Sequence, residues 1–198
     1  MFIASGVLGL IIPLLVIGVV LYLVLKRRNE SEGVSAYQGL LMVYFYTIIG
    51  ASIITAAIGA GYLLTAAFSS AYSDRSVVND FTAGVTMFCT GTIICVLHAV
   101  GKKAVEAREG KTTPLLRRVY LFIMLGIFSL GGIVSLPLAI YETAHYYVQE
   151  ERWSDPAGAI AAAVVIVPMW IYYLMRVISE TRAARNERPS NDVAGGTV

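Results

Sequence analysis

The stretch GLLMVYFYTIIGASIITAAIGAGYLLTAAF, residues 39–68, contains no Asp, Glu, Lys or Arg. A helix needs roughly 20 residues to cross about 30 Å of hydrocarbon, whereas a membrane β-strand needs about 10 residues and alternates polar with apolar side chains. The stretch therefore predicts a membrane-spanning helix. Other charge-free runs of sufficient length lie at residues 2–25, 81–100, 119–141 and 158–175. We expect an all-α integral membrane protein with five transmembrane helices, forming a single domain over residues 1–185.

The composition excludes most other classes of protein. Hydrophobic residues make up 57% of the 198-residue chain, charged residues make up 14%, and the mean hydropathy is +0.71. Soluble domains are roughly 45–50% apolar and about 25% charged, so a soluble globular domain is excluded. Two cysteines are too few for a disulfide scaffold, and a net charge of +2 does not indicate a nucleic-acid-binding protein.

The basic residues predict the orientation, because Lys and Arg accumulate in the short loops on the cytoplasmic side of a membrane. All 15 of them except Arg75 and Arg152 fall on one side of the predicted spans, in segments 26–28, 101–118 and 176–188. We therefore expect the N-terminus outside, the C-terminus in the cytoplasm and a location in the plasma (inner) membrane. Residues 186–198 are rich in Gly, Pro, Ser and Asn, which predicts a disordered cytoplasmic tail.

Two of the runs, residues 39–68 and 119–141, look alike when they are shifted by 76 positions. The matched residues are Val43-Tyr44 with Val119-Tyr120, and Gly50 with Gly126. Each run is followed by a loop and a returning span. The pattern favours one helix plus two repeated helix pairs, over residues 37–100 and 113–178.

The segment RRVYLF at residues 117–122, followed by Gly126 and Ser129-Leu130, resembles the opening of the repeating helix in a family of uncharacterised prokaryotic multi-pass membrane domains. In the earlier copy, Leu41-Met42 stands where the two arginines would be. The resemblance covers residues 37–178. It implies an architecture of helix pairs, and because the family has no assigned activity it implies no chemistry.

The five runs contain no Asp, Glu, Lys or Arg. An ionisable side chain inside the bilayer costs roughly 2.5–3.5 kcal/mol on insertion scales, and by default it marks an ion path, a proton relay or a voltage sensor. The sequence also has no P-loop, no GxGxxG motif and no Cys/His set with metal-ligand spacing. We therefore predict that the protein is not an enzyme, holds no metal and does not couple transport to an ion gradient.

His98 and His145 are the candidate cofactor-binding residues, because imidazoles hold haem between membrane helices. His98 lies at the inner end of the run 81–100, and His145 lies in the loop beyond the outer end of the run 119–141. About 30 Å of hydrocarbon separates these ends, so one haem cannot use both histidines. Either could be the single axial ligand of a haem or a chlorophyll-type pigment. The favoured interpretation is that both are interfacial histidines, and no cofactor is predicted.

Small residues predict the helix contacts, because helices in lipid pack closely where small side chains let their backbones approach. The predicted helix-packing residues are Ser52, Ala56, Gly59, Ala60, Gly131, Ser135 and Ala161. Tyrosines at the ends of the spans, among them Tyr120, Tyr172 and Tyr173, predict an interfacial aromatic belt.

The predicted spans have many small-residue packing faces and no catalytic or metal-binding motif. This combination favours a non-catalytic accessory or scaffolding subunit of a larger bacterial membrane complex, respiratory or photosynthetic. Two other functions stay open: a small oligomeric transporter or channel without intramembrane charges, and a protein that holds a haem or pigment through a single histidine. The expected partners are the lipid bilayer and other transmembrane subunits, with anionic lipid at the basic segment 101–118. No nucleic-acid partner is expected.

Overall fold

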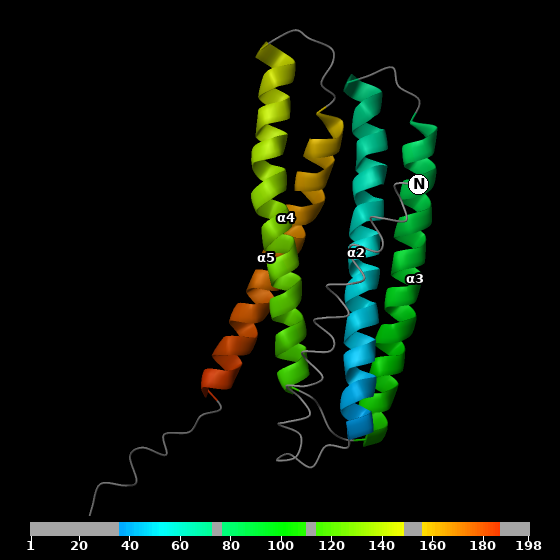
Figure 1. Ribbon diagram of the computed structural model, residues 1–198, viewed down its shortest axis with the longest axis vertical. Helices are drawn as coiled ribbons and strands as arrows, with labels where there is room; N and C mark the ends of the chain where they lie inside the picture. Colours follow the sequence, from blue (N-terminus) through cyan, green and yellow to red (C-terminus); the bar gives the residue numbers. More distant parts are fainter. Residues whose placement is uncertain (1–35, 73–76, 110–113, 149–155, 187–198) are drawn as a thin grey trace, which may run out of the picture.

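The computed structural model describes residues 36–72, 77–109, 114–148 and 156–186. They form the helices α2 (Ala36–Tyr72), α3 (Val78–Glu109), α4 (Pro114–Val148) and α5 (Ala157–Asn186), drawn in Figure 1. Each helix is long and apolar enough to cross a membrane, so the prediction of an all-helical, multi-pass architecture is confirmed to this extent. The predicted span at residues 2–25 lies outside the described residues, and the count of five spans and their orientation stay predictions.

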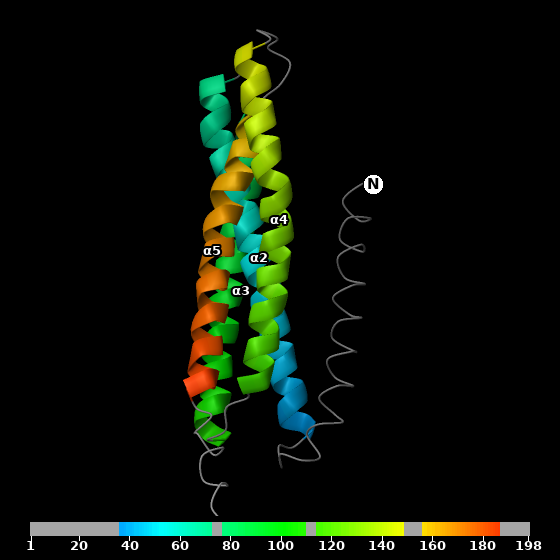
Figure 2. The same cartoon turned by 90° about the vertical axis from the view of Figure 1, so that its left-hand side faces the viewer.

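The described helices form two hairpins that point the same way, α2–α3 and α4–α5 (Figure 1). Helix α2 packs along α3 on one side and against α5, and less closely α4, on the other. Figure 2 shows α4 and α5 in front of the α2–α3 pair. Among the described helices α3 packs against α2 alone. The common direction of the hairpins agrees with a helix pair used twice, although the duplication itself stays a prediction.

The helices extend beyond the charge-free runs. Helix α3 continues to Glu109, and within this extension Lys102 Nζ lies 3.7 Å from Glu106 Oε1, one turn away. Lys, Glu and Arg are good helix formers, so a helix that leaves the membrane does not have to end there. Most of the basic segment 101–118 is therefore helical, with residues 110–113 between α3 and α4.

Two expectations about segments flanking the spans are corrected. His145 lies inside α4, which continues to Val148, and not in a loop after the fourth span. Helix α5 includes Asn186, the first residue of the tail predicted to be disordered, and the remainder of that tail lies outside the described residues.

One end of the bundle brings together the start of α2, the end of α3 and the start of α4. There Met42 and Tyr46 of α2 pack with Leu116 of α4, and Val105 of α3 lies against them. We call this end the basic end because it carries Lys102, Lys103, Arg117 and Arg118.

The main apolar core lies between α4 and α5. Its buried members are Leu121, Met124 and Phe128 of α4 and Tyr173 and Val177 of α5. Ile53 and Ile54 of α2 pack against this cluster, which joins the second hairpin to the first. In lipid such a core is stabilised by close van der Waals packing more than by removal of apolar surface from water.

Candidate functional site

Helices α2 and α3 approach each other at backbone distance. A Cβ atom added to Gly59 would lie 2.3 Å from the backbone nitrogen of Phe88, and one added to Gly91 would lie 2.6 Å from that of Ala56. Both distances are far inside van der Waals contact, so each position accepts only glycine without a shift of the backbone. We call this contact the glycine seam; it comprises Ser52, Ala56, Gly59 and Leu63 of α2 and Gly84, Phe88 and Gly91 of α3.

Three of the packing residues predicted on α2, namely Ser52, Ala56 and Gly59, therefore lie against α3 of the same chain. Ala60, the fourth, is half-buried. Gly84 and Gly91, which form the α3 side of the seam, were not predicted. Their spacing of seven residues is about two helical turns and places them on one face of a helix, so the signal was present in the sequence.

The packing residues predicted on α4 and α5 are also covered. A Cβ atom added to Gly131 would lie 3.2 Å from Cγ2 of Ile166, which is on α5. Ser135, about one turn further along α4, is 5% exposed, and Ala161 of α5 is fully buried. Small residues on both hairpins thus contribute to contacts within this chain.

Four aromatic side chains connect α2, α4 and α5 on the side of the basic end. The ring centroids of Tyr46 and Tyr120 are 5.1 Å apart, and Tyr173 stacks on Phe128 at 5.5 Å with an interplanar angle of 9°. The hydroxyls of Tyr120 and Tyr173 form a hydrogen bond of 3.4 Å. Tyr173 is only 2% exposed, so the prediction that it belongs to an interfacial belt is wrong. Its hydroxyl finds a partner inside the bundle, which permits burial of the ring.

Charged side chains at the basic end pair with one another and with this aromatic group. Lys102 Nζ donates a hydrogen bond to the Tyr46 hydroxyl at 3.2 Å and lies 4.5 Å from the centroid of its ring. Arg117 of α4 forms an ion pair with Glu180 of α5. These contacts join the ends of different helices. They do not place an acid and a base beside a common cavity, as acid–base catalysis would require.

His98 is held by hydrogen bonds at both ring nitrogens. Its Nδ1 lies 2.9 Å from the carbonyl oxygen of Ile94, and its Nε2 lies 3.2 Å from the hydroxyl of Tyr44 on α2. A carbonyl only accepts, so Nδ1 carries a proton, and Nε2 shares a hydrogen bond with the Tyr44 hydroxyl. A metal centre could bind Nε2 only by displacing Tyr44.

His145 is half-buried on α4, with its ring centroid 5.8 Å from that of Tyr141. Helices α3 and α4, which carry His98 and His145, are not packed together, so the structure does not bring the two histidines to one site. Among the residues that the structure describes, no group of three or more His, Cys, Asp or Glu side chains is placed to hold a metal ion.

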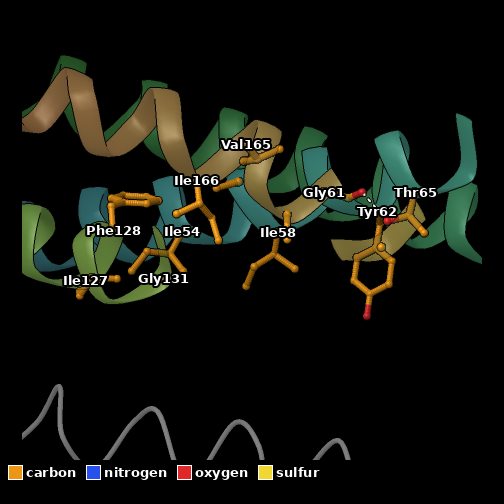
Figure 3. A pocket seen from close by; sticks show the side chains of 13 residues that line it. Ile54, Ile58, Gly61, Tyr62, Thr65, Ile127, Phe128, Gly131, Val165 and Ile166 are labelled. Atoms are coloured by element: carbon orange, nitrogen blue, oxygen red, sulfur yellow. Dashed lines mark hydrogen bonds between the residues drawn. The ribbon is translucent and has the colours of Figure 1, made fainter. Parts of the chain in front are cut away.

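A groove of about 400 Å³ runs between α2, α4 and α5, away from the basic end (Figure 3). We call it the lateral groove. Ile54 and Ile58 of α2, Phe128 of α4 and Ile166 of α5 line it with apolar side chains, and Tyr62 lies at its far end. Its size is in the range of small-molecule pockets, but it lacks the convergent polar groups that fix the orientation of a small ligand.

Comparison with protein-family models, curated proteins and solved structures finds no match to this chain. The resemblance of residues 117–122 to a prokaryotic membrane-domain family therefore stays a prediction, and the assignment of function depends on the geometry.

Proposed function

We propose that the protein is a non-catalytic accessory or scaffolding transmembrane subunit of a larger bacterial membrane complex, respiratory or photosynthetic, in the plasma (inner) membrane. The observation that carries the proposal is the position of α3, which among the described helices packs against α2 alone. In its most apolar stretch of 18 residues only 11% are buried, against 28% in the corresponding stretch of α4. With one neighbour among the described helices, α3 has surface that a partner subunit can cover.

The exposed surface of α3 suits another helix. Ile93 and Leu97 are 58% and 64% exposed, and Thr82, Thr86 and Thr90 recur at intervals of four on the outer surface. The hydroxyls of Thr82 and Thr86 bond back to carbonyls of α3 itself, which leaves their methyl groups and small volume for packing. Small hydroxylated residues are enriched where membrane helices meet.

The proposal includes the complete topology: five spans with the N-terminus outside and the C-terminus in the cytoplasm, arranged as one helix followed by two repeated pairs. It is supported by the position of Lys102, Lys103, Arg117 and Arg118 at the same end of the bundle. On this topology the basic end faces the cytoplasm, where anionic lipid headgroups attract each Lys or Arg by about 1 kcal/mol.

The two alternative functions have no specific observation in their favour. A transporter or channel needs a route for its substrate, and the lateral groove is lined by apolar side chains and opens on the flank of the bundle. A pigment or haem protein would use His98 or His145 as its single ligand. Both ring nitrogens of His98 are hydrogen-bonded, and the ring of His145 lies beside Tyr141 near the end of α4.

The test is purification of the tagged chain in mild detergent, followed by native mass spectrometry. We expect other transmembrane subunits in fixed stoichiometry, and we expect Ile93→Ala with Leu97→Ala to release them while the chain stays inserted. The matched control is Leu130→Ala with Ile133→Ala, two residues of α4 that are 69% and 70% exposed. A chain that always runs alone, or only with copies of itself, overturns the proposal.

A further inference from the structure

We propose that the lateral groove is the docking site of residues 2–25, the charge-free segment that precedes α2. The groove is formed by residues of three helices, and its walls include Gly61, Gly131 and Gly158. Within the part of the chain that the structure describes, a Cβ atom added to Gly61 or to Gly158 would meet nothing within 4 Å. These two glycines therefore differ from those of the glycine seam, because they leave a hollow where the seam glycines admit a neighbouring backbone.

The length of the preceding segment fits this position. The sequence predicts a helix over residues 2–25, which would be about 36 Å long at about 1.5 Å per residue. Residues 26–35 connect it to Ala36, and ten extended residues reach at most about 35 Å. The end of the segment at residue 25 can therefore lie at most about 35 Å from the start of α2, which allows us to place it at the basic end of the bundle.

The basic residues that follow residues 2–25 indicate the depth of this segment in the membrane. Lys26, Arg27 and Arg28 follow the segment directly, and we place them at the level of Lys102 and Arg117. Residue 25 is then level with Gly39, the first residue of the apolar run in α2. Ile54 and Tyr62 lie 15 and 23 positions after Gly39, so residues 10 and 2 of the antiparallel segment lie at the same two depths.

The part of the segment at the depth of the groove has the composition that close packing needs. Residues 2–10 read FIASGVLGL and hold four of the five Gly, Ala and Ser residues of the segment. The groove offers Gly61, Gly131 and Gly158 at that level. Small residues on both sides let helix backbones approach, which is how membrane helices associate.

The exposed side of α3 fits this segment less well, because the glycines of α3 are turned toward α2. A Cβ atom at Gly84 would lie 2.8 Å from the backbone nitrogen of Leu63, and Gly91 packs against Ala56. Its exposed surface carries large side chains such as Ile93 and Leu97 and remains available to another subunit. This inference rests on the proposed five-span topology, and it does not depend on the proposed role as a subunit of a larger complex.

Disulfide crosslinking in native membranes tests the proposal. Single cysteines at each of residues 3–9 are paired with Ile58→Cys, in a chain carrying Cys89→Ala and Cys95→Ala. Ile58 is 45% exposed at the groove. We expect crosslinks within one chain, strongest at positions three or four residues apart. The matched control keeps Cys89 and the native Ile58, since Cys89 is exposed on α3 beside Phe88, which lies against Gly59 at the same depth.

Filling the groove provides a second measurement. Gly61→Leu has room within the described helices, so the chain should still insert, but crosslinking through Ile58→Cys should fall several-fold. Gly126→Leu, at a glycine of α4 that also meets nothing within 4 Å, should leave it unchanged. Crosslinks that favour Cys89, bands that join two copies of the chain, or no crosslinks at all each overturn the proposal. An absence of all crosslinks would indicate that lipid occupies the lateral groove.

Discussion

Replacement of Gly59 by alanine is the most direct test of the glycine seam. The added Cβ atom would lie 2.3 Å from the Phe88 nitrogen and 2.9 Å from the Gly84 carbonyl oxygen, where ordinary contact begins at 3.4 Å. The two backbones must therefore move apart by about 1 Å at this point. Both obstructing atoms belong to the backbone of α3, so no side-chain rotation can relieve the contact.

The magnitude follows from two opposing effects. Overpacking a well-packed contact costs about 1–3 kcal/mol. Alanine in place of a helical glycine stabilises the helix by about 0.5–1 kcal/mol. We expect a net destabilisation of about 1–2 kcal/mol, because the separation also weakens the neighbouring contacts of Ala56 and Leu63, whose van der Waals attraction falls by a quarter to a half over a gap of about 0.5–1 Å.

The assay is reversible unfolding of the full chain in mixed micelles, compared with Gly126→Ala. Gly126 is exposed on α4 and an added Cβ atom would meet nothing, so its replacement should raise the free energy of unfolding by about 0.5–1 kcal/mol. The same chemical change is thus expected to act with opposite signs at two helical glycines. If the free energy of unfolding of Gly59→Ala equals or exceeds that of the unmodified chain, the reasoning on the glycine seam is refuted.

Three further predictions concern the topology, the aromatic contact and transport. In a chain that carries Cys89→Ala and Cys95→Ala, Ser73→Cys and Ser154→Cys should react with an impermeant maleimide added outside intact cells, and Thr112→Cys should not. Labelling of Thr112→Cys would contradict the predicted number of spans or their orientation. Tyr173→Phe should lower the free energy of unfolding by about 0.5–1.5 kcal/mol through loss of the hydrogen bond to Tyr120, and Tyr173→Ala by about 3–5 kcal/mol through loss of the ring; equal effects in thermal unfolding would contradict the importance of stacking. Proteoliposomes of the purified chain should accumulate no solute in response to a proton or sodium gradient, because the charge-free runs hold no carboxylate to titrate, and gradient-dependent uptake would support the transporter alternative.

The limits of sequence reasoning are clearest in the tyrosines. Tyr120 and Tyr173 occur near the ends of apolar runs, where an interfacial position is the usual expectation. Tyr173 is buried because Tyr120, 53 positions earlier, supplies a partner for its hydroxyl and Phe128 supplies a ring to stack on. Neither partner can be assigned without knowing which faces of α4 and α5 meet.

The two matched glycines of the predicted repeat also differ in their surroundings. Gly50 is buried, with an added Cβ atom placed 3.3 Å from the Met124 sulfur, whereas Gly126 is exposed and meets nothing. Their sequence surroundings are similar, but Gly50 lies on a helix in the middle of the described bundle and Gly126 on a helix at its edge. Their different roles follow from the order in which the helices pack.

The sequence by itself determined that long apolar helices cover residues 39–68, 81–100, 119–141 and 158–175, because a backbone in lipid must satisfy its own hydrogen bonds and a charge-free run of this length does so as a helix. It also indicated that Ser52, Ala56 and Gly59 can admit another backbone. Only the tertiary structure decided which helix they meet, because small residues permit close approach without specifying a partner. The glycine seam forms because Gly84 and Gly91 of α3 lie opposite these residues. The lateral groove forms between α2, α4 and α5, where Gly61 and Gly158 have no side chain to fill the space.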